Sequence, residues 1–211
     1  MEWPRDRVER FAPRELNGST VGLVGYGSIG REIARLVKPL GVTILAAKKD
    51  LRHPEDTGYQ IPGLGDPNGD LFDRLYPVQA LKSMFAMCDF VIMTLPLSPE
   101  TRGLVGADHL AAMKNTAFLI DIGRGGIVDQ AALLTALQER KIAGAALDVF
   151  SEEPLPPGSP FWRMPRVIAT PHVGGISLQY RERAAAMFAE NLRRYVSGQT
   201  LLNLYNVERG Y

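Results

Sequence analysis

Short apolar runs alternate with amphipathic segments along most of the chain. Residues 20–24 form an apolar run, and residues 28–40 repeat their apolar positions at the spacing of a helix. A second apolar run follows at residues 43–46, just after Gly41, a residue typical of helix ends. The pattern predicts a strand, a helix and a second strand. The expected buried face of this helix consists of Ile29, Ile33, Leu36, Val37 and Leu40.

The same alternation continues further along the chain. Apolar runs short enough to be strands occupy residues 90–94, 117–122, 143–147 and 167–169, with helical stretches near Leu81, Leu110 and Leu134 between them. Six strands with interleaved helices predict an α/β fold with a doubly wound parallel sheet.

Two segments depart from this alternation. Residues 52–77 are polar and rich in Gly, Pro and Asp, which predicts a long surface excursion. Residues 178–196 predict a long last helix that ends at Gly198, and we expect its apolar stripe to pack in a core. The stripe consists of Ala185, Phe188, Ala189, Leu192 and Val196.

A glycine motif lies between the first predicted strand and helix. Residues 25–30 read GYGSIG, the GxGxxG pattern in which glycines allow a tight turn and close approach of a pyrophosphate to the helix N-terminus. The flanking strands complete a βαβ unit, so we expect a dinucleotide here; the alternative is a strand-turn-helix without a ligand. The predicted contacts of this turn are Gly25, Tyr26, Gly27, Ser28 and Ile29.

The end of the second predicted strand bears on which dinucleotide binds. An NAD site commonly places an acid there, whereas this chain has Lys48 and Lys49, followed by Asp50. Two ammonium groups suit a ribose 2′-phosphate, so NADP is slightly favoured over NAD. In the alternative interpretation both lysines are solvated and Asp50 turns back to the ribose hydroxyls.

Composition and charge limit the classes of protein to which the chain can belong. The chain has 211 residues, 45% of them hydrophobic, which suits a globular protein, and its net charge of +1 gives no field that would draw it to nucleic acid or an anionic membrane. No apolar run reaches the roughly 18 residues of a membrane span, and the start of the chain is charged where a signal peptide is apolar. We expect a cytoplasmic protein with no metal site, and a buried thiol at Cys88.

Four further motifs follow the glycine turn in order. They are LPLSPETRGL at residues 95–104, DIGRGGIVD at 121–129, ALDVFSEEP at 146–154 and TPHVGG at 170–175. This ordered set resembles the D-2-hydroxyacid dehydrogenase family over essentially the whole chain. The resemblance implies an NAD(P)-dependent oxidoreductase that interconverts a 2-keto acid and a D-2-hydroxy acid.

The resemblance also assigns roles to single residues. Arg124 would hold the substrate carboxylate, His172 would exchange the proton, and Glu153 would orient the imidazole ring and favour its protonated form. Asp148 would contact the nicotinamide carboxamide, unless it is a turn aspartate, and His53 and His109 are interpreted as surface residues. The remaining expected cofactor contacts are Leu95, Pro96, Thr101, Ile122, Gly123, Gly174 and Gly175, with Arg124 and His172.

Family members carry a second domain, which adds expectations about organisation. We expect residues 1–17 to be the remnant of a shortened substrate domain, 18–176 the dinucleotide-binding domain, and 177–211 a helix and tail that return to the substrate domain. Half of the substrate cleft would then be missing, so cofactor binding is expected more firmly than turnover. The resemblance further implies a homodimer. Alternatives are a nucleotide-sensing, corepressor-like interaction protein and a phosphite-type dehydrogenase.

Overall fold

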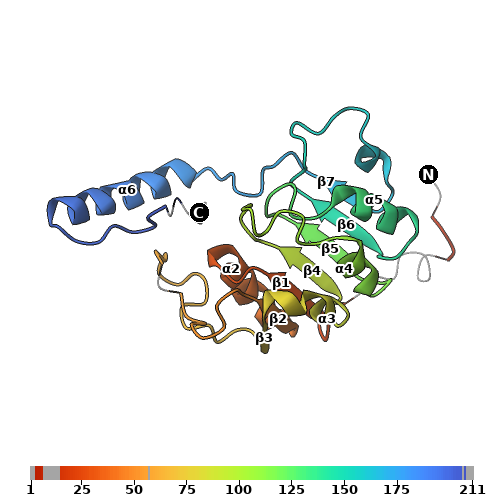
Figure 1. The fold of residues 1–211 in the computed structure, drawn as a ribbon, viewed down its shortest axis with the longest axis horizontal. Coiled ribbons are helices and arrows are strands. Elements are labelled where there is room, and N and C mark those ends of the chain that lie inside the picture. The colour runs from red at the N-terminus through yellow and green to blue at the C-terminus, as the bar shows by residue number, and fades with distance from the viewer. Residues whose placement is uncertain (1–2, 7–14, 57, 206, 208–211) are drawn as a thin grey trace.

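The centre of the molecule is a seven-stranded, fully parallel sheet with the strand order β3-β2-β1-β4-β5-β6-β7 (Figure 1). The computed structural model describes residues 3–6, 15–56, 58–205 and 207. The strands are β1 (Thr20–Val24), β2 (Thr43–Ala47), β3 (Arg74–Tyr76), β4 (Phe90–Met93), β5 (Phe118–Asp121), β6 (Gly144–Leu147) and β7 (Val167–Ala169). The predicted doubly wound α/β fold is confirmed.

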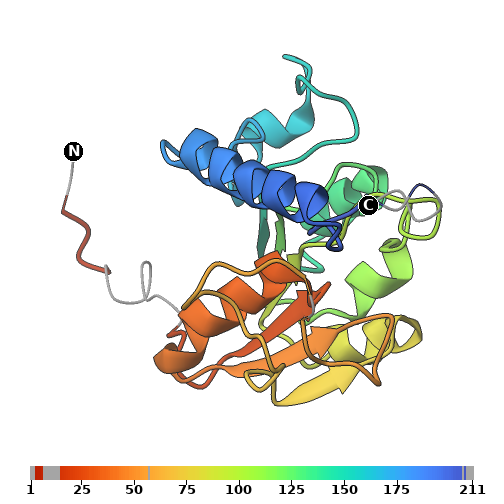
Figure 2. The same ribbon diagram turned by 90° about the vertical axis from the view of Figure 1, so that its left-hand side faces the viewer.

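Helices cover both faces of this sheet (Figure 2). The helices on the sheet are α2 (Ser28–Val37), α3 (Leu81–Phe85), α4 (Ala107–Ala112) and α5 (Gln130–Gln138). A further helix, α6 (Tyr180–Val196), follows near the end of the chain, and short 3-10 turns form η1 (Lys38–Leu40), η2 (Val78–Ala80) and η3 (Pro160–Arg163). Side chains of α3, α4 and α5 form one apolar core with the sheet, and α2 contributes to a second, smaller core on the opposite face. The inner strands β2, β1, β4, β5 and β6 are largely buried, which explains their near-continuous apolar runs, whereas the edge strands β3 and β7 are partly exposed.

The position of β1 determines where a ligand can bind. β1 pairs with β2 on one side and with β4 on the other, so the chain reverses its direction across the sheet at this strand. In open parallel sheets a crevice forms at such a switch point, outside the carboxyl ends of the strands. The glycine turn at residues 25–30 starts at this crevice.

The polar excursion at residues 52–77 contains a strand that the sequence pattern did not predict. Residues Arg74–Tyr76 form β3, which pairs with β2 at the sheet edge, and the Tyr76 side chain is buried. The sheet therefore has seven strands, and the prediction of six was wrong. β3 is short and begins with an exposed arginine, so its apolar signal is weak.

The expected buried faces of two helices were also partly wrong. In α2, Ile33 and Val37 pack on the core, whereas Ile29 and Leu36 are exposed and Arg31 is buried. The apolar stripe of α6 is exposed, with 70% of Phe188 accessible to solvent, and no residue of this helix is buried. Figure 1 shows why: α6 projects away from the sheet at the end of an extended connection.

Candidate functional site: the cofactor crevice and the His172 pair

The glycine turn combines a tight backbone with open space. Gly25 has a φ of +102°, which favours glycine, and a Cβ on Gly30 would lie 2.3 Å from the Gly25 carbonyl oxygen. A Cβ on Gly27 would meet nothing within 4 Å among the described residues. Gly27 is the N-cap of α2, and no side chain in the described part of the molecule caps this helix. The first N–H groups of α2 therefore face an open cradle that fits a pyrophosphate.

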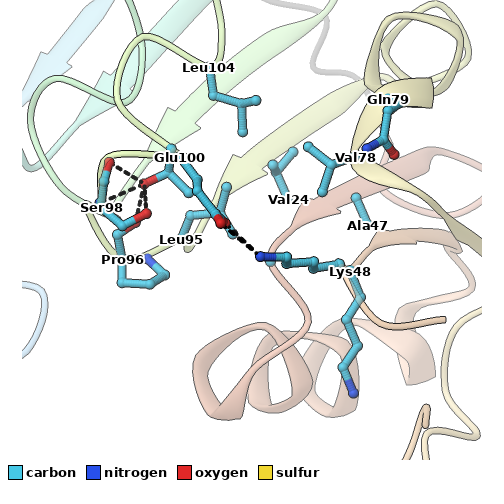
Figure 3. Close-up of a pocket in the computed structure, with 13 residues that line it drawn as sticks. Val24, Ala47, Lys48, Val78, Gln79, Leu95, Pro96, Ser98, Glu100 and Leu104 are labelled. Atoms are coloured by element: carbon cyan, nitrogen blue, oxygen red, sulfur yellow. Dashed lines mark hydrogen bonds and ion pairs between the residues drawn. The ribbon is translucent and has the colours of Figure 1, made fainter. Parts of the chain in front are cut away.

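A cavity of about 390 Å³ continues from the turn along the ends of β1 and β2. Figure 3 shows apolar side chains, among them Val24, Val78 and Leu104, around this space. The Thr101 hydroxyl donates to the Pro96 carbonyl over 2.7 Å and fixes the wall formed by the connection after β4. The lining is apolar on its sides and charged at its rim, which suits a flat heterocycle joined to a polar sugar.

The two lysines that the sequence places after β2, Lys48 and Lys49, line this cavity. The Lys49 ammonium group pairs with the Glu100 carboxylate at 2.7 Å, and the Lys48 ammonium group donates to the His53 carbonyl oxygen. Partial burial lowers the pKa of Lys48. The Asp50 carboxylate accepts from the His53 ring at 2.7 Å, which lowers the pKa of Asp50 and raises that of His53.

A neighbouring cavity brings these groups next to the glycine turn. It is lined by Gly25, Tyr26, Gly27, Lys48, Lys49, Asp50, His53, Glu55, Thr94, Leu95 and Pro96. Most of these residues were predicted to bind the cofactor. His53 was not predicted to do so, because its position beside the glycine turn depends on how the polar excursion folds and not on its neighbours in the sequence.

Tyr26 lies in the glycine motif, but its side chain is buried. Its hydroxyl donates to Asp66 over 2.6 Å, and burial together with this hydrogen bond raises the pKa of Tyr26. The Arg31 guanidinium lies 4.8 Å from the centre of the Tyr26 ring and donates to the carbonyl oxygens of Asp66 and Pro54. This network fastens the polar excursion to α2, and sequence reasoning missed it because Arg31 and Asp66 are 35 residues apart.

His172 and Glu153 meet at the carboxyl edge of the sheet. The His172 Nδ1 atom lies 2.8 Å from Glu153 Oε2, and the other carboxylate oxygen accepts from the Phe150 backbone N–H at 2.9 Å. The hydrogen bond from His172 holds the pKa of Glu153 below its ordinary value. Because Nδ1 is engaged, the Nε2 atom of the ring is the one left for a ligand.

Arg124 follows the end of β5, and its side chain is exposed. Its Nη1 atom donates to the Gly123 carbonyl at 2.7 Å. A Cβ on Gly125 would lie 1.8 Å from the Phe150 carbonyl oxygen, so this turn packs directly against the peptide that holds Glu153. Through Phe150 the structure links the Arg124 turn to the His172 pair, although Arg124 does not line the cavity beside His172.

Asp148, one residue beyond β6, is buried and fixes the segment that carries His172. Its carboxylate accepts from the Thr170 hydroxyl at 2.6 Å and from the backbone N–H groups of Val173 and Gly174. Burial raises the pKa of Asp148, but these hydrogen bonds outweigh that effect and the net shift is downward. Gly174 and Gly175 are exposed beside it, and Ile122 packs against the α2 side of the sheet.

Other site classes find little support among the described residues. No group of three or more His, Cys, Asp or Glu side chains there is arranged to hold a metal ion. Every helix in the described part of the chain is too short or too polar to cross a membrane. Cys88 is buried, as the sequence predicts, and burial raises the pKa of its thiol to about 12.

The switch-point crevice, the open glycine cradle and the apolar cavity define a dinucleotide-binding protein. A family model described as D-isomer specific 2-hydroxyacid dehydrogenase, NAD binding domain, matches residues 1–174. The chain therefore belongs to the D-isomer specific 2-hydroxyacid dehydrogenase family, as the motifs suggested.

Relatives and solved structures agree with this assignment. A glyoxylate reductase of Korarchaeum cryptofilum is 38% identical over 194 residues, covering 92% of this chain and 54% of that protein. A D-isomer specific 2-hydroxyacid dehydrogenase from Xanthobacter autotrophicus Py2, solved with NADPH and MES, is 34% identical with a TM-score of 0.77, covering 98% of this chain and 81% of that one.

A third comparison concerns an NADPH-dependent glyoxylate/hydroxypyruvate reductase from Sinorhizobium meliloti, solved with NADP and sulfate. It is 30% identical with a TM-score of 0.76, covering 94% of this chain and 58% of that one. The chain spans about half the length of the curated relatives it matches. These relatives are named as reductases and dehydrogenases, so the corepressor-like and phosphite-type alternatives are not favoured.

Proposed function

We propose that this chain is the cofactor-binding part of an oxidoreductase that transfers hydride between NAD(P)H and a 2-keto acid, giving a D-2-hydroxy acid. The observation that carries the proposal is the hydrogen-bonded pair of His172 and Glu153 at the same sheet edge as the open glycine turn. The family assignment supports it. Small substrates are favoured because several relatives are named glyoxylate reductases.

The proton is exchanged by His172. When bound, the nicotinamide supplies the hydride, and the Nε2 atom of His172 donates a proton to the substrate oxygen during reduction. Glu153 keeps the ring oriented and offsets its positive charge, and the Phe150 N–H keeps Glu153 in place. In the oxidation direction the same Nε2 atom accepts the proton.

Arg124 binds the substrate carboxylate. A guanidinium presents several N–H groups in one plane, so it can hold a carboxylate with two hydrogen bonds. The internal bond to the Gly123 carbonyl uses one Nη1 donor and leaves the others for a ligand. When the cofactor is bound, Asp148 would hold the carboxamide of the nicotinamide with the acceptor capacity that its bonds to Thr170, Val173 and Gly174 leave free.

For the cofactor we favour NADP over NAD. Lys48, Lys49 and His53 line one cavity with the glycine turn, and three basic groups suit a 2′-phosphate. Two acidic residues, Asp50 and Glu55, line the same cavity. Binding would require Lys49 to exchange its exposed pair with Glu100, which costs little because exposed ion pairs contribute about 0–1 kcal/mol. Lys49→Ala should weaken NADPH binding about tenfold and NADH binding about twofold or less, with Lys141→Ala as an exposed control.

Two organisational expectations remain proposals. We propose that residues 18–176 form the cofactor-binding unit and that residues 177–211 serve a second body, which fits the projection of α6 from the sheet (Figure 1). Limited proteolysis should then cut near Gly175 and leave a folded core. We also expect a homodimer, which sedimentation would test.

The deciding experiment measures oxidation of NADPH and NADH by a full-length version of the protein, with glyoxylate and hydroxypyruvate as substrates. We expect reduction of both acids, and we expect His172→Ala to lower kcat by about 100-fold or more while leaving cofactor affinity within about twofold. His109→Ala is the matched control, because His109 lies in α4 and lines neither cavity beside the glycine turn. An unchanged rate in His172→Ala would overturn the assignment.

A further inference from the structure

Asp121 is a buried carboxylic acid at the root of the Arg124 turn. It is the last residue of β5, and only 4% of it is exposed. In the sheet it lies between Met93 of β4 and Leu147 of β6, both buried apolar residues. Acidic side chains are rarely buried among such neighbours without a reason.

The hydrogen bonds of Asp121 indicate that reason. Its Oδ1 atom accepts from the Gly123 backbone N–H at 3.1 Å, and the carbonyl of Gly123 accepts from Arg124 Nη1 at 2.7 Å. Beyond Arg124, the backbone of Gly125 rests against the Phe150 carbonyl. Arg124 is thus held between two fixed peptides, and the first of them depends on the Asp121 side chain.

Among the residues that the structure describes, only burial and the hydrogen bond from Gly123 shift the pKa of the Asp121 carboxyl group. Burial raises the pKa of Asp121 to about 7, and the Gly123 N–H offsets only part of this effect. Asp148 directly follows β6, the strand next to Asp121. Its carboxylate already accepts hydrogen bonds from Thr170, Val173 and Gly174. From β4 the register partner is Met93, and the Arg124 guanidinium is bound to Gly123.

We propose that Asp121 is a positioning residue that fixes the turn carrying Arg124, and thereby the direction of the guanidinium toward the substrate. This inference rests on the proposed function, in which Arg124 binds a carboxylate. The positioning role rests on the bond that the Asp121 carboxyl group accepts from the Gly123 N–H, and on the bond that the Gly123 carbonyl accepts from Arg124.

The test compares Asp121→Asn with Asp121→Leu in the full 211-residue chain. Asn keeps an oxygen acceptor for the Gly123 N–H and cannot ionise, whereas Leu removes the acceptor. Nuclear magnetic resonance of the ¹⁵N-labelled protein reports the Gly123 amide and the Arg124 Nε–H directly. The Gly123 amide should shift with pH around a midpoint of about 7 in the parent and stay constant in Asp121→Asn.

Binding supplies a second, independent measurement. Oxamate, a stable analogue of a 2-keto acid, is titrated into the protein saturated with NADPH. We expect Asp121→Leu to bind oxamate about tenfold more weakly with NADPH affinity within about twofold, and Asp121→Asn to restore parent-like affinity.

The outcomes separate this inference from the proposed function. If the parent fails to bind oxamate while the Gly123 and Arg124 signals move together in Asp121→Leu, the proposed function fails and the positioning role stands. If the parent binds oxamate and Asp121→Leu binds it equally well, the positioning role is overturned. A Gly123 amide that does not respond to pH also overturns it, and this measurement needs no variant that folds poorly.

Discussion

The phenol hydroxyl of Tyr26 donates a 2.6 Å hydrogen bond to Asp66, which joins the glycine turn to a segment 40 residues further along the chain. Asp66 also accepts from the backbone N–H groups of Asp70 and Leu71, so its carboxylate organises the polar excursion around it. The wall of the cofactor crevice therefore depends on a buried polar network.

The hydrogen bond between Tyr26 and Asp66 predicts that replacing Asp66 lowers the unfolding free energy more than replacing Tyr26 does. Tyr26→Phe removes one hydrogen bond but leaves Asp66 with its backbone donors, so unfolding free energy should fall by about 1 kcal/mol. Asp66→Ala leaves a buried hydroxyl and two N–H groups without their acceptor, and should cost about 3 kcal/mol. Urea unfolding followed by circular dichroism measures both.

The same pair of variants separates stability from ligand binding. Because the Tyr26 hydroxyl points to Asp66 rather than into the crevice, Tyr26→Phe should keep NADPH affinity within about twofold. A large loss of affinity in Tyr26→Phe would mean that the hydroxyl contacts the cofactor.

Asp148 predicts a pH-dependent stability. Its pKa is lowered in the folded chain, so its contribution is complete above the ordinary value of 3.8 and is lost as pH falls through the lower native value. Asp148→Asn should lower unfolding free energy by about 1–3 kcal/mol at pH 7, with the deficit shrinking below pH 4. A deficit that stays constant from pH 7 to pH 3 would contradict this account.

The exposed stripe of α6 predicts tolerance to polar substitution. Leu192→Ser should change unfolding free energy by about 0.5 kcal/mol or less, because surface substitutions away from special features have small effects. Phe85→Ala, in the buried core next to α4, should cost about 3–5 kcal/mol and serves as the comparison. If both variants lose similar stability, α6 packs against the rest of the chain in solution.

Most of the sheet could be predicted from the sequence because its inner strands are largely buried on both faces. That environment leaves continuous apolar runs, and β1, β4 and β5 lie where those runs predict them. β3 gave no such signal because it is three residues long and lies at the edge. Arg31 could not be predicted as buried, since its acceptors are carbonyls of a distant segment that no helical periodicity reveals.

The candidate site, too, could be predicted from the sequence only in part. Motif order placed His172 and Glu153 on neighbouring connections, and the structure brings their side chains into contact. Asp121 opens the motif at residues 121–129, but the sequence predicts no role for it, because that role depends on its burial beside Met93 and Leu147 of the adjacent strands. A role could be predicted from the sequence where a motif carries it, but not where it depends on neighbours from distant parts of the chain.

The two last glycines of the turn predict opposite effects of one methyl group. A Cβ on Gly30 would lie 2.3 Å from the Gly25 carbonyl oxygen, so Gly30→Ala must move backbone and should cost about 1–3 kcal/mol or more of unfolding free energy. A Cβ on Gly27 meets no described atom within 4 Å, and its φ of −92° is ordinary for alanine. Gly27→Ala should therefore fold with parent-like stability, within about 0.5 kcal/mol.

Gly27 should nevertheless be required for the ligand. If a pyrophosphate fills the open cradle, the added methyl occupies its place, and NADPH affinity should fall about tenfold or more in Gly27→Ala. Calorimetric titration of NADPH and thermal unfolding of the same samples decide between the two roles. Should Gly27→Ala bind NADPH like the parent, the space above Gly27 is not where the phosphates bind, and the cofactor must approach the sheet edge differently.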